Sequence, residues 1–353
     1  MSTALEEILA PRPPYRDGGA GSDNAAALRA SRVRPAFFDV SCLMYRLMYA
    51  KVDTYCKDCG YDEARIAHAV AADVINDIAD ACRNFACAPV LAFDSGTSLR
   101  KRLYPGYKGN RGAQKRTEKQ ERVLGCKEEV KRLLRRVYAP GYRLQGFCVH
   151  GYEGDDIIAS FVLGLKQDVS AVGVAYDKPI VIVSSDHDVH QVVEGNVMFA
   201  DVVSGVLCDA EALYKHNKIR CSDVVASKCV GGCKSDNVGN VPGCGEKTVA
   251  EFLDKRTFEV GVPKARAALN SAAGEEILRR NMKLVRLPYE GDPAMPPLRL
   301  SNVWPKPGVP EEMAALMDGH GVPRSAWPSF ADVTLPRAAG AVPVCEWKRK
   351  VIE

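Results

Sequence analysis

The sequence has no long apolar run. A membrane-spanning helix needs about 18 or more consecutive apolar residues, and no stretch of this chain approaches that length. The N-terminus also lacks a basic stretch followed by an apolar one, because Glu6 and Glu7 come early and a proline soon follows. We therefore predict neither a membrane span nor a secretory signal, and we expect the protein to work in the cytoplasm.

A zinc-binding pattern is missing too, although the chain holds 13 cysteines. Cys56 and Cys59 form a C-x-x-C pair, but a structural zinc site needs a second pair. The nearest candidates, Cys82 and Cys87, have the wrong spacing for one. An odd number of cysteines would leave one unpaired in a secreted protein. We therefore expect reduced, mostly buried thiols that pack as small apolar side chains.

The excess of charge is small, since the formal net charge is +4 over 353 residues. Only the distribution of charge along the chain is therefore informative about partners. Hydrophobic residues make up 46% and charged residues 26%, which is ordinary for a globular protein with a real core. No internal repeat is visible, so one large α/β domain with a helical appendage is the simplest architecture.

Composition and periodicity divide the chain into four parts. Residues 1–33 are rich in Ala, Pro, Gly, Ser and Arg without sustained periodicity, so we predict a mobile tail. Residues 34–208 should form an α/β core, and residues 209–290 a helical lobe interrupted by a Gly-rich turn. Prolines are frequent in residues 291–353, which we expect to lie over the surface as a partly disordered extension.

Short apolar runs alternate with helical patterns in the predicted core. Strands are expected near residues 36–40, 89–94, 143–149 and 179–183, and helices over residues 62–85 and 153–166. Strands that alternate with helices favour a central, mostly parallel sheet.

Acidic side chains follow three of these strands. Asp39, Asp94, Asp186 and Asp188 come at the strand ends, and in an open α/β sheet such ends meet in one crevice. Further acids open the second helix and a later turn; they are Glu153, Asp155, Asp156 and Asp236. An acid at a helix N-terminus also complements the helix dipole, and an Asp at a strand end is a common turn residue. No single acid is therefore decisive.

Several acidic segments aimed at one edge of a sheet are more informative than one. Converging carboxylates repel one another strongly even at an effective dielectric constant of about 20, and divalent cations relieve that repulsion. Oxygen ligands favour Mg²⁺ or Mn²⁺ over zinc. The pattern therefore indicates a site for two-metal hydrolysis of a phosphodiester.

Residues 98–138 are strongly basic. Between Arg100 and Arg136, fourteen Lys and Arg side chains against four acidic ones leave a net charge of +10. A solvated helix face is the usual alternative, but phosphate binding fits this imbalance better. The candidate contacts are Arg100, Lys115 and Arg116, while Tyr104 and Tyr107 either stack on unpaired bases or pack under a loop.

Residues 239–248 have the sequence Gly-Asn-Val-Pro-Gly-Cys-Gly-Glu-Lys-Thr, which is a helix-hairpin-helix signature. Gly243 and Gly245 permit a tight turn with positive φ, and the helix that follows offers free backbone N–H groups to a phosphate. A plain turn between two helices is the alternative. We expect this element to bind the DNA backbone through both glycines and through Lys228, Lys247 and Thr248.

These segments occur in a particular order along the chain. They are Phe38-Asp39-Val40, Ala92-Phe93-Asp94, Leu103 to Arg111, Gly151 to Asp156, Ser185 to Asp188, Ser235-Asp236-Asn237 and Val241 to Thr248. In this order and spacing, the set resembles the flap-endonuclease family, which includes phage 5′-nucleases and the 5′-nuclease domain of bacterial DNA polymerase I.

The resemblance implies a PIN-like 5′-nuclease core, a helical arch through which a single 5′ strand passes, and a C-terminal helix-hairpin-helix lobe. It implies two Mg²⁺ ions, for which Mn²⁺ substitutes, and a K⁺ ion in the hairpin. The first Mg²⁺ would be held by Asp39, Asp94, Glu153, Asp155 and Asp156, and the second by Asp186, Asp188 and Asp236. Lys108 and Arg111 match cations near the scissile phosphate and would neutralise charge there.

One position departs from the family pattern. The family has Gly-Asp-x-x-Asp-Asn in its last acidic motif, whereas this chain has Gly232-Cys233-Lys234-Ser235-Asp236-Asn237. A thiol is a poor ligand for Mg²⁺, so we expect a weaker second site with a preference shifted toward Mn²⁺. Comparing cleavage in Mg²⁺ and in Mn²⁺ for the wild type and Cys233→Asp tests this hypothesis, and unchanged ratios would contradict it.

The implied function is that of a structure-specific 5′-3′ exonuclease and flap endonuclease, which hydrolyses DNA near 5′ ends for primer removal or flap processing in replication. The partners would be replication proteins and DNA with a 5′ flap, 5′ overhang or nick, bound by a monomer in the cytoplasm, or in the host cytoplasm if a phage encodes it. Two alternatives stay open. One is a non-catalytic, structure-specific DNA-binding protein disabled through Cys233, and the other is an RNase on a similar metal-nuclease fold.

Overall fold

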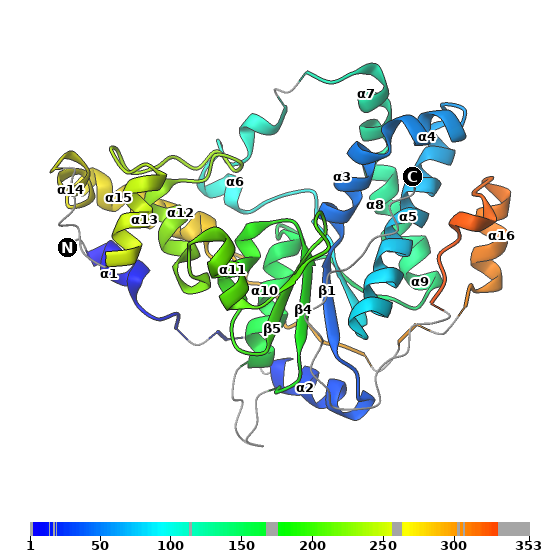
Figure 1. Ribbon diagram of the computed structural model, residues 1–353, viewed down its shortest axis with the longest axis horizontal. Helices are drawn as coiled ribbons and strands as arrows, with labels where there is room; N and C mark the ends of the chain where they lie inside the picture. The colour runs from blue at the N-terminus through cyan, green and yellow to red at the C-terminus, as the bar shows by residue number, and fades with distance from the viewer. Residues whose placement is uncertain are drawn as a thin grey trace.

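The computed structural model describes residues 3–330, apart from residues 14, 17, 19, 113–114, 167–175, 256–262, 302–303 and 306–307. Within these residues lies a six-stranded sheet with the order β3-β2-β1-β4-β5-β6 (Figure 1). The strands are β1 (Pro35–Asp39), β2 (Ala88–Ala92), β3 (Gln145–Phe147), β4 (Ile180–Ser184), β5 (Val197–Asp201) and β6 (Leu207–Cys208). β1 to β5 run parallel to their neighbours and β6 is antiparallel to β5, which confirms the predicted α/β fold with a mostly parallel sheet.

The direction in which strands are added reverses at β1. This strand pairs with β2 on one side, where Asp39 lies opposite Ala92, and with β4 on the other, where Phe38 lies opposite Val183. β3 extends the sheet beyond β2, and β5 extends it beyond β4. The carboxyl ends of β1, β2 and β4 therefore meet at a topological switch point, where open α/β sheets bind ligands.

Helices pack on both faces of the sheet, and a further group of helices lies to the left of it in Figure 1. Those around the sheet are α2 (Ala20–Ser31), α3 (Val40–Ala50), α4 (Val52–Asp58), α5 (Glu63–Phe85), α10 (Gly154–Lys166), η3 (His187–Val192), α11 (Ala210–Asn217) and η4 (Cys221–Asp223). The basic segment forms α6 (Arg100–Leu103), η1 (Gly109–Gly112), α7 (Glu118–Gly125), α8 (Lys127–Leu133), the π-helix η2 (Leu134–Tyr138) and α9 (Ala139–Gly141). None of the described helices is both long and apolar enough to cross a membrane.

A helical lobe lies beside the sheet, at the left of Figure 1. It consists of α1 (Thr3–Leu9), α12 (Val224–Gly231), α13 (Glu246–Lys255), α14 (Pro263–Leu269) and α15 (Ala272–Val285). Its core gathers buried side chains from all five of these helices, among them Leu5, Val230, Val249, Leu269 and Leu278. The lobe therefore has an apolar core of its own, separate from the two cores that cover the sheet.

Neighbouring residues of β1 support the two cores of the sheet. Phe38 packs with α3, α5 and α8 on one face, whereas Phe37 packs with α2 and α10 on the other. Both side chains are almost completely buried. Because successive side chains of a strand point to opposite faces, one short apolar strand anchors both layers of helices and fixes the position of Asp39 at its end.

The prediction of a mobile tail over residues 1–33 is wrong for the described part of that segment. α1 buries Leu5 in the core of the lobe, and α2 buries Leu28 in the core beside α10. The Asn24 side chain donates to Leu298 O at 2.8 Å and accepts from the Leu300 N–H at 2.7 Å. Helices this short gain their stability from tertiary contacts, and composition alone does not reveal such contacts.

The predicted extension over residues 291–353 is described as far as Phe330. It includes α16 (Glu311–Gly319) and η5 (Arg324–Ala326). Met313 and Met317 of α16 are buried in the same core as α5, and Phe330 joins them there at 1% exposure. Residues 331–353, which contain the part expected to be disordered, lie outside the described residues.

Candidate functional site

Three strand ends and the start of α10 meet at the carboxyl edge of the sheet. Asp39, at the end of β1, accepts hydrogen bonds from the Cys42 N–H at 3.0 Å and from the Ser184 hydroxyl at 3.1 Å. Asp94, which follows β2, accepts one from the Gly154 N–H at 2.8 Å. These contacts bring the ends of β1, β2 and β4 together with the first turn of α10.

Three carboxylates gather at the start of α10. Ligand atoms of Glu153, Asp155 and Asp156 lie within 4.8 Å of one another, and the exposed fractions of these residues are 9%, 8% and 0%. Among the described residues, no other set of three or more His, Cys, Asp or Glu side chains comes as close together. This set is therefore the strongest candidate in the described chain for holding a cation.

Burial disfavours ionisation of two acids at this edge. It raises the pKa of Asp155 well above its usual range, and the neighbouring charges of Asp156 and Glu153 add to the shift. Burial also raises the pKa of Asp39 to about 6, with a further contribution from Asp94. A bound cation would oppose both shifts, because it favours the ionised carboxylates.

Arg100 lies inside the site. It is 1% exposed, and its guanidinium binds the two Asp156 oxygens at 2.6 and 2.7 Å. Its Nε–H donates to Leu284 O at 2.7 Å. The prediction that Arg100 contacts DNA is therefore wrong, since a buried bidentate pair occupies its donors. The pairing also neutralises Asp156, the one carboxylate of the three that is fully buried.

Tyr107 is buried as well, which favours the packing alternative for this residue over stacking on bases. It is 2% exposed, and its hydroxyl lies 3.0 Å from Glu153 Oε2 and 3.1 Å from Asp236 Oδ2. A ring enclosed in this way has no free face for stacking. Tyr104 is half-buried, with the Arg280 guanidinium carbon 4.9 Å from its ring centroid.

Lys108 and Arg111 pair with acids across the site. Lys108 Nζ lies 2.9 Å from Glu153 Oε2, and Arg111 Nη2 lies 2.8 Å from Asp236 Oδ1. Although burial opposes ionisation, Lys108 and Arg100 hold the pKa of Glu153 below its usual value. The backbone of Lys108 has a φ of 55°, which is uncommon outside glycine, and its N–H donates to Asp236 O at 2.8 Å.

The acids expected to hold a second ion do not gather in the described structure. Asp188 is 6% exposed and forms an ion pair with Lys228 of α12. Asp186 is half-buried and accepts a hydrogen bond from the Asp188 N–H at 2.8 Å. Asp236, after α12, is paired with Arg111. The ammonium group of Lys228, predicted as a phosphate contact, thus faces an acid of the site.

Cys233 has a neutral partner. It is 8% exposed in the core of the lobe, and its Sγ lies 3.1 Å from the Ser235 hydroxyl oxygen. It belongs to no group of three or more potential ligands within the described residues. Nothing in these contacts replaces the carboxylate that the family pattern has at this position.

The predicted hairpin lies between α12 and α13. Gly243 has a φ of 80° in the turn, and the Cys244 N–H donates to Val241 O at 2.9 Å. α13 begins at Glu246, directly after the exposed Gly245, so its first N–H groups have no partner within the helix. Thr248 is partly buried in its first turns, whereas the side chain of Lys247 lies outside the described part.

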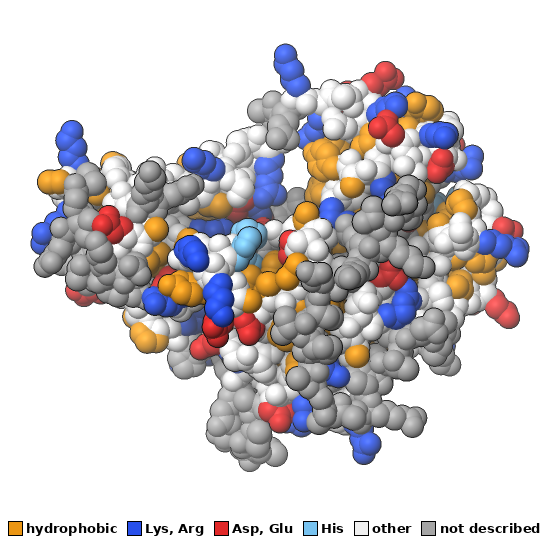
Figure 2. Space-filling model, in the orientation of Figure 1, with side chains coloured by type: hydrophobic (Ala, Val, Ile, Leu, Met, Phe, Trp, Pro, Cys, Tyr) orange, Lys and Arg blue, Asp and Glu red, His pale blue; other side chains and the backbone are white. Residues whose placement is uncertain are grey.

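A basic hollow of about 390 Å³ lies beside Asp94. It is lined by Asp94, Ser95, Gly96, Glu128, Lys131, Arg132, Arg135 and Arg136. Arg135 and Arg136 are exposed on η2, and Lys115 and Arg116 are exposed before α7. On the face drawn in Figure 2, Lys and Arg side chains also lie on both sides of the wider recess between the lobe and the α7 side of the molecule. Basic side chains therefore line the hollow next to Asp94.

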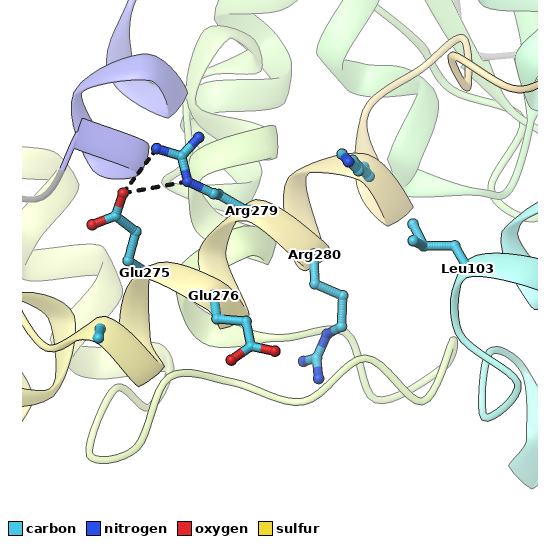
Figure 3. Close-up of a pocket in the computed structure, with 7 residues that line it drawn as sticks. Leu103, Glu275, Glu276, Arg279 and Arg280 are labelled. Carbon is cyan, nitrogen blue, oxygen red and sulfur yellow. Dashed lines mark hydrogen bonds and ion pairs between the residues drawn. The ribbon is translucent and has the colours of Figure 1, made fainter.

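A larger hollow, of about 590 Å³, lies on α15 (Figure 3). It is lined by Leu103, Ala272, Glu275, Glu276, Arg279, Arg280 and Lys283. Its charged lining consists of two acidic and three basic side chains, and Glu275 Oε1 lies 2.8 Å from Arg279 Nη2. None of the acids at the sheet edge lines it, so its size does not make it the functional site.

Gln191 of η3 has a structural role that the sequence does not reveal. Its side-chain amide donates to Asp188 O at 2.9 Å and to Val285 O at 3.0 Å, and its carbonyl accepts from the Leu287 N–H at 2.9 Å. A single Gln three residues after an Asp is an unremarkable pattern. No signal in the sequence indicates that this residue connects the core with the lobe.

The chain resembles known proteins in both sequence and fold. Residues 36–220 match the family described as "5′-3′ exonuclease, N-terminal resolvase-like domain". DNA polymerase I of Bacillus caldotenax is 30% identical over 207 residues, which cover 56% of this chain and 21% of that protein. DNA polymerase I of Pseudomonas aeruginosa is 28% identical over 164 residues, covering 46% and 16%. The chain thus spans about a fifth of the length of these relatives.

Solved structures of bacteriophage T5 proteins share the fold. A T5 protein co-crystallised with metal ions has a TM-score of 0.57 at 20% identity, over 72% of this chain and 90% of that one. A T5 flap endonuclease, in a pseudo-enzyme-product complex with DNA and metal ions, has a TM-score of 0.56 at 20% identity, over 72% and 89%. These similarities confirm the fold that the family resemblance implies.

Proposed function

The chain belongs to the family of 5′-3′ exonucleases with an N-terminal resolvase-like domain, and from this premise we propose that it is a metal-dependent 5′-3′ exodeoxyribonuclease and flap endonuclease. The observation that carries the proposal is the gathering of Glu153, Asp155 and Asp156 at the switch point of the sheet, between basic segments. Hydrolysis of DNA near 5′ ends would serve primer removal or flap processing in replication, in the cytoplasm.

The donor set fits a divalent cation bound through oxygen. Asp155 is buried without an ion-pair partner among the described residues, and its repulsion from Glu153 and Asp156 is what a cation would relieve. We propose that Asp39, Asp94, Glu153 and Asp155 hold Mg²⁺ or Mn²⁺, and that Asp156 contributes through its pairing with Arg100. When bound, the ion would supply Lewis-acid activation of water and of the phosphate.

A second ion is part of the same proposal. Asp186, Asp188 and Asp236 would hold it, and Lys228 would then have to leave Asp188. The hairpin around Gly243 would hold the K⁺ ion that the family resemblance implies. The T5 proteins of similar fold were crystallised with metal ions, which supports a metal site in this fold.

Lys108 and Arg111 would act on the phosphodiester. Both are ion-paired with carboxylates of the site, which keeps their cationic groups beside the acids where the phosphate would react. A cation placed at the reacting phosphate stabilises the negative charge that develops in the transition state. The strained backbone of Lys108, fixed to Asp236, would hold its ammonium in position.

DNA would contact two basic regions, one on each side of the acids. The hollow with Lys131 and Arg135 would take the phosphates of the single 5′ strand, and Lys115 and Arg116 would add to this contact. The hairpin, with Lys247 and Thr248, would take the duplex backbone. The proposed substrates are therefore DNA with a 5′ flap, a 5′ overhang or a nick, bound by a monomer that cooperates with replication proteins.

The test is cleavage of a 5′-labelled flap duplex in Mg²⁺. We expect the wild type to cut near the junction, and Asp155→Asn and Asp186→Asn to bind the flap without cutting it. Binding is measured separately by fluorescence anisotropy in Ca²⁺. Tight binding by a wild type that cuts nothing in Mg²⁺ or Mn²⁺ would reject the assignment as an enzyme. It would favour a structure-specific DNA-binding protein in which Cys233 has abolished cleavage.

A further inference from the structure

The segment that leaves the lobe is fixed to the core by side chains from distant parts of the chain. We call residues 284–289 the seam. Arg100 donates to Leu284 O at 2.7 Å, and Asp156 accepts from the Tyr289 N–H at 2.7 Å. Both of these side chains belong to the acidic site. One side of the seam is therefore held by the same ion pair that neutralises the α10 carboxylates.

The other side of the seam is held through Gln191. Its amide bridges Asp188 O and Val285 O, and its carbonyl accepts from the Leu287 N–H. Because η3 also carries Asp188, which pairs with Lys228 of α12, this junction connects a strand end of the core with two helices of the lobe.

Arg12 completes this junction. Its guanidinium donates to Leu287 O through Nη1 and to the Gln191 side-chain carbonyl at 2.8 Å through Nη2. It is partly buried, and burial, followed by the charge of Arg286, lowers its pKa to about 10. At this value the side chain stays protonated at neutral pH, so both hydrogen bonds are charge-assisted.

The segment around Arg12 runs from the lobe to the core. α1 buries Leu5 in the lobe, the Tyr15 hydroxyl lies 2.8 Å from the Ser160 hydroxyl of α10, and α2 buries Leu28 in the core (Figure 1). We call the described residues between 3 and 31, which leave out 14, 17 and 19, the strap. It lies outside the stretch, residues 36–220, that matches the family.

We propose that the strap, through Arg12, fixes the lobe relative to the core and so sets where the DNA is cut. This inference rests on the proposed function, in which the hairpin holds duplex DNA and the sheet edge cleaves. The distance between these two regions then determines which phosphate reaches the acids. Arg12 touches no part of the proposed DNA path, so it acts as a positioning residue through Gln191 and the seam.

The first experiment maps cleavage positions on a flap duplex at nucleotide resolution. Arg12→Met should raise the share of product cut away from the main position roughly ten-fold, as expected for losing charge-assisted hydrogen bonds at a junction, with little change in flap binding. Arg12→Lys should restore part of the precision, because it keeps one charged donor. Arg16→Met is the matched control, since Arg16 is an exposed cation of the same strap and should cut as the wild type does.

The second experiment measures amide hydrogen exchange at single residues by NMR, together with the melting temperature of each variant. In Arg12→Met we expect faster exchange at Leu287, whose amide is held at the Gln191 junction, and a smaller change at Tyr289, which Asp156 holds. Faster exchange with unchanged cleavage positions would overturn the proposal and leave Arg12 a folding contact. Equal loss of precision in Arg16→Met would overturn it too, by showing a general charge effect.

The two readouts separate this inference from the proposed function. If the wild type cuts no flap, the proposed function fails and with it the role in cut position. Exchange at Leu287 then decides alone whether Arg12 holds the seam, and an unchanged rate in Arg12→Met would reject that contact as well.

Discussion

The acids of α10 are neutralised in a different way from the acids expected to hold a second ion, which are Asp186, Asp188 and Asp236. We call this second group the β4 side of the site. At α10, Glu153 and Asp156 pair with Lys108 and Arg100, but Asp155 lies between them with no cation in ion-pair contact among the described residues. On the β4 side, Asp188 pairs with Lys228 and Asp236 with Arg111.

The two groups of acids therefore differ in how their negative charge is balanced. A buried carboxylate among other carboxylates is costly unless it is protonated or bound to a cation, whereas a carboxylate beside Lys or Arg already has its counter-charge. We therefore expect a divalent ion to bind more tightly at α10 than on the β4 side, where it must displace a lysine. Cys233 should weaken ion binding on the β4 side further, because it places a thiol where the family pattern has a carboxylate.

The largest effect should follow from changing the unpaired acid. Asp155→Asn should lower flap cleavage roughly a thousand-fold or more, because loss of a bound ion removes several kcal/mol of transition-state stabilisation. The same change removes buried repulsion, so the melting temperature in EDTA should rise. Single-turnover cleavage and thermal melting measure the two effects. Asp58→Asn, which changes an exposed acid, is the control; equal loss of cleavage there would reject the assignment of Asp155.

The next effect comes from opening a pair on the β4 side. Lys228→Met leaves Asp188 buried with no counter-charge, and we expect it to lower the free energy of unfolding by about 3 kcal/mol. Adding Asp188→Asn should recover most of that loss, because the uncompensated charge is then gone. Urea unfolding without metal ions measures both. No recovery in the double variant would show that Lys228 stabilises the lobe by packing and that the pair is incidental.

A smaller effect is expected in the pH dependence of stability. The folded state raises the pKa of Asp39 to about 6, so between pH values of about 4 and 6 the folded state binds this proton more tightly than the unfolded state does. In EDTA this contribution is greatest at the acidic end and is lost as the pH rises through 6, a change of about 2–3 kcal/mol. Asp39→Asn should remove it. A wild-type curve that stays parallel to the Asp39→Asn curve from pH 4 to pH 8 would contradict the shift.

The smallest effect should come from the exposed partner. The Arg111 side chain is 55% exposed although it pairs with Asp236, and exposed ion pairs contribute about 0–1 kcal/mol. Asp236 is itself buried, but without Arg111 it keeps the Tyr107 hydroxyl at 3.1 Å and Lys108 Nζ at 4.0 Å. Arg111→Ala should therefore leave unfolding in urea almost unchanged, while flap cleavage falls if Arg111 serves the phosphate. A loss of stability as large as that of Lys228→Met would show that the partly exposed pair contributes as much to the free energy of unfolding as the buried pair.

Much of the fold was predictable because its signals are local. The apolar run that becomes β1 ends at Asp39, and the run that becomes β2 is followed by Asp94, so strand and acid are read together from adjacent residues. The start of α10 is marked by Glu153, Asp155 and Asp156 in the same way. Parallel order then follows from the alternation of strands and helices.

The roles of Arg100, Tyr107 and Arg12 were not predictable, because each depends on a partner far away in the sequence. Arg100 occurs in a run of basic residues, which normally indicates a solvated surface, and only the packing of α6 against Asp156 makes it a buried residue. Arg12 lies in a stretch without periodicity, and its partner Gln191 is 179 positions away. Composition and spacing describe neighbours along the chain and carry no information on such pairs.

The seam also bears on the order in which the chain assembles during synthesis. Its contacts join residues separated by 275 positions for Arg12 and Leu287, 184 for Arg100 and Leu284, and 133 for Asp156 and Tyr289. Contacts this distant form late, because long loops must close first. A nascent chain from which the seam has not yet emerged therefore already contains all the acids of the site. It still lacks Leu284 and Tyr289, whose backbone groups bind Arg100 and Asp156. If the proposed function holds, the cutting centre is completed only when the lobe is complete, so fragments of an unfinished chain should bind ions poorly and leave DNA intact.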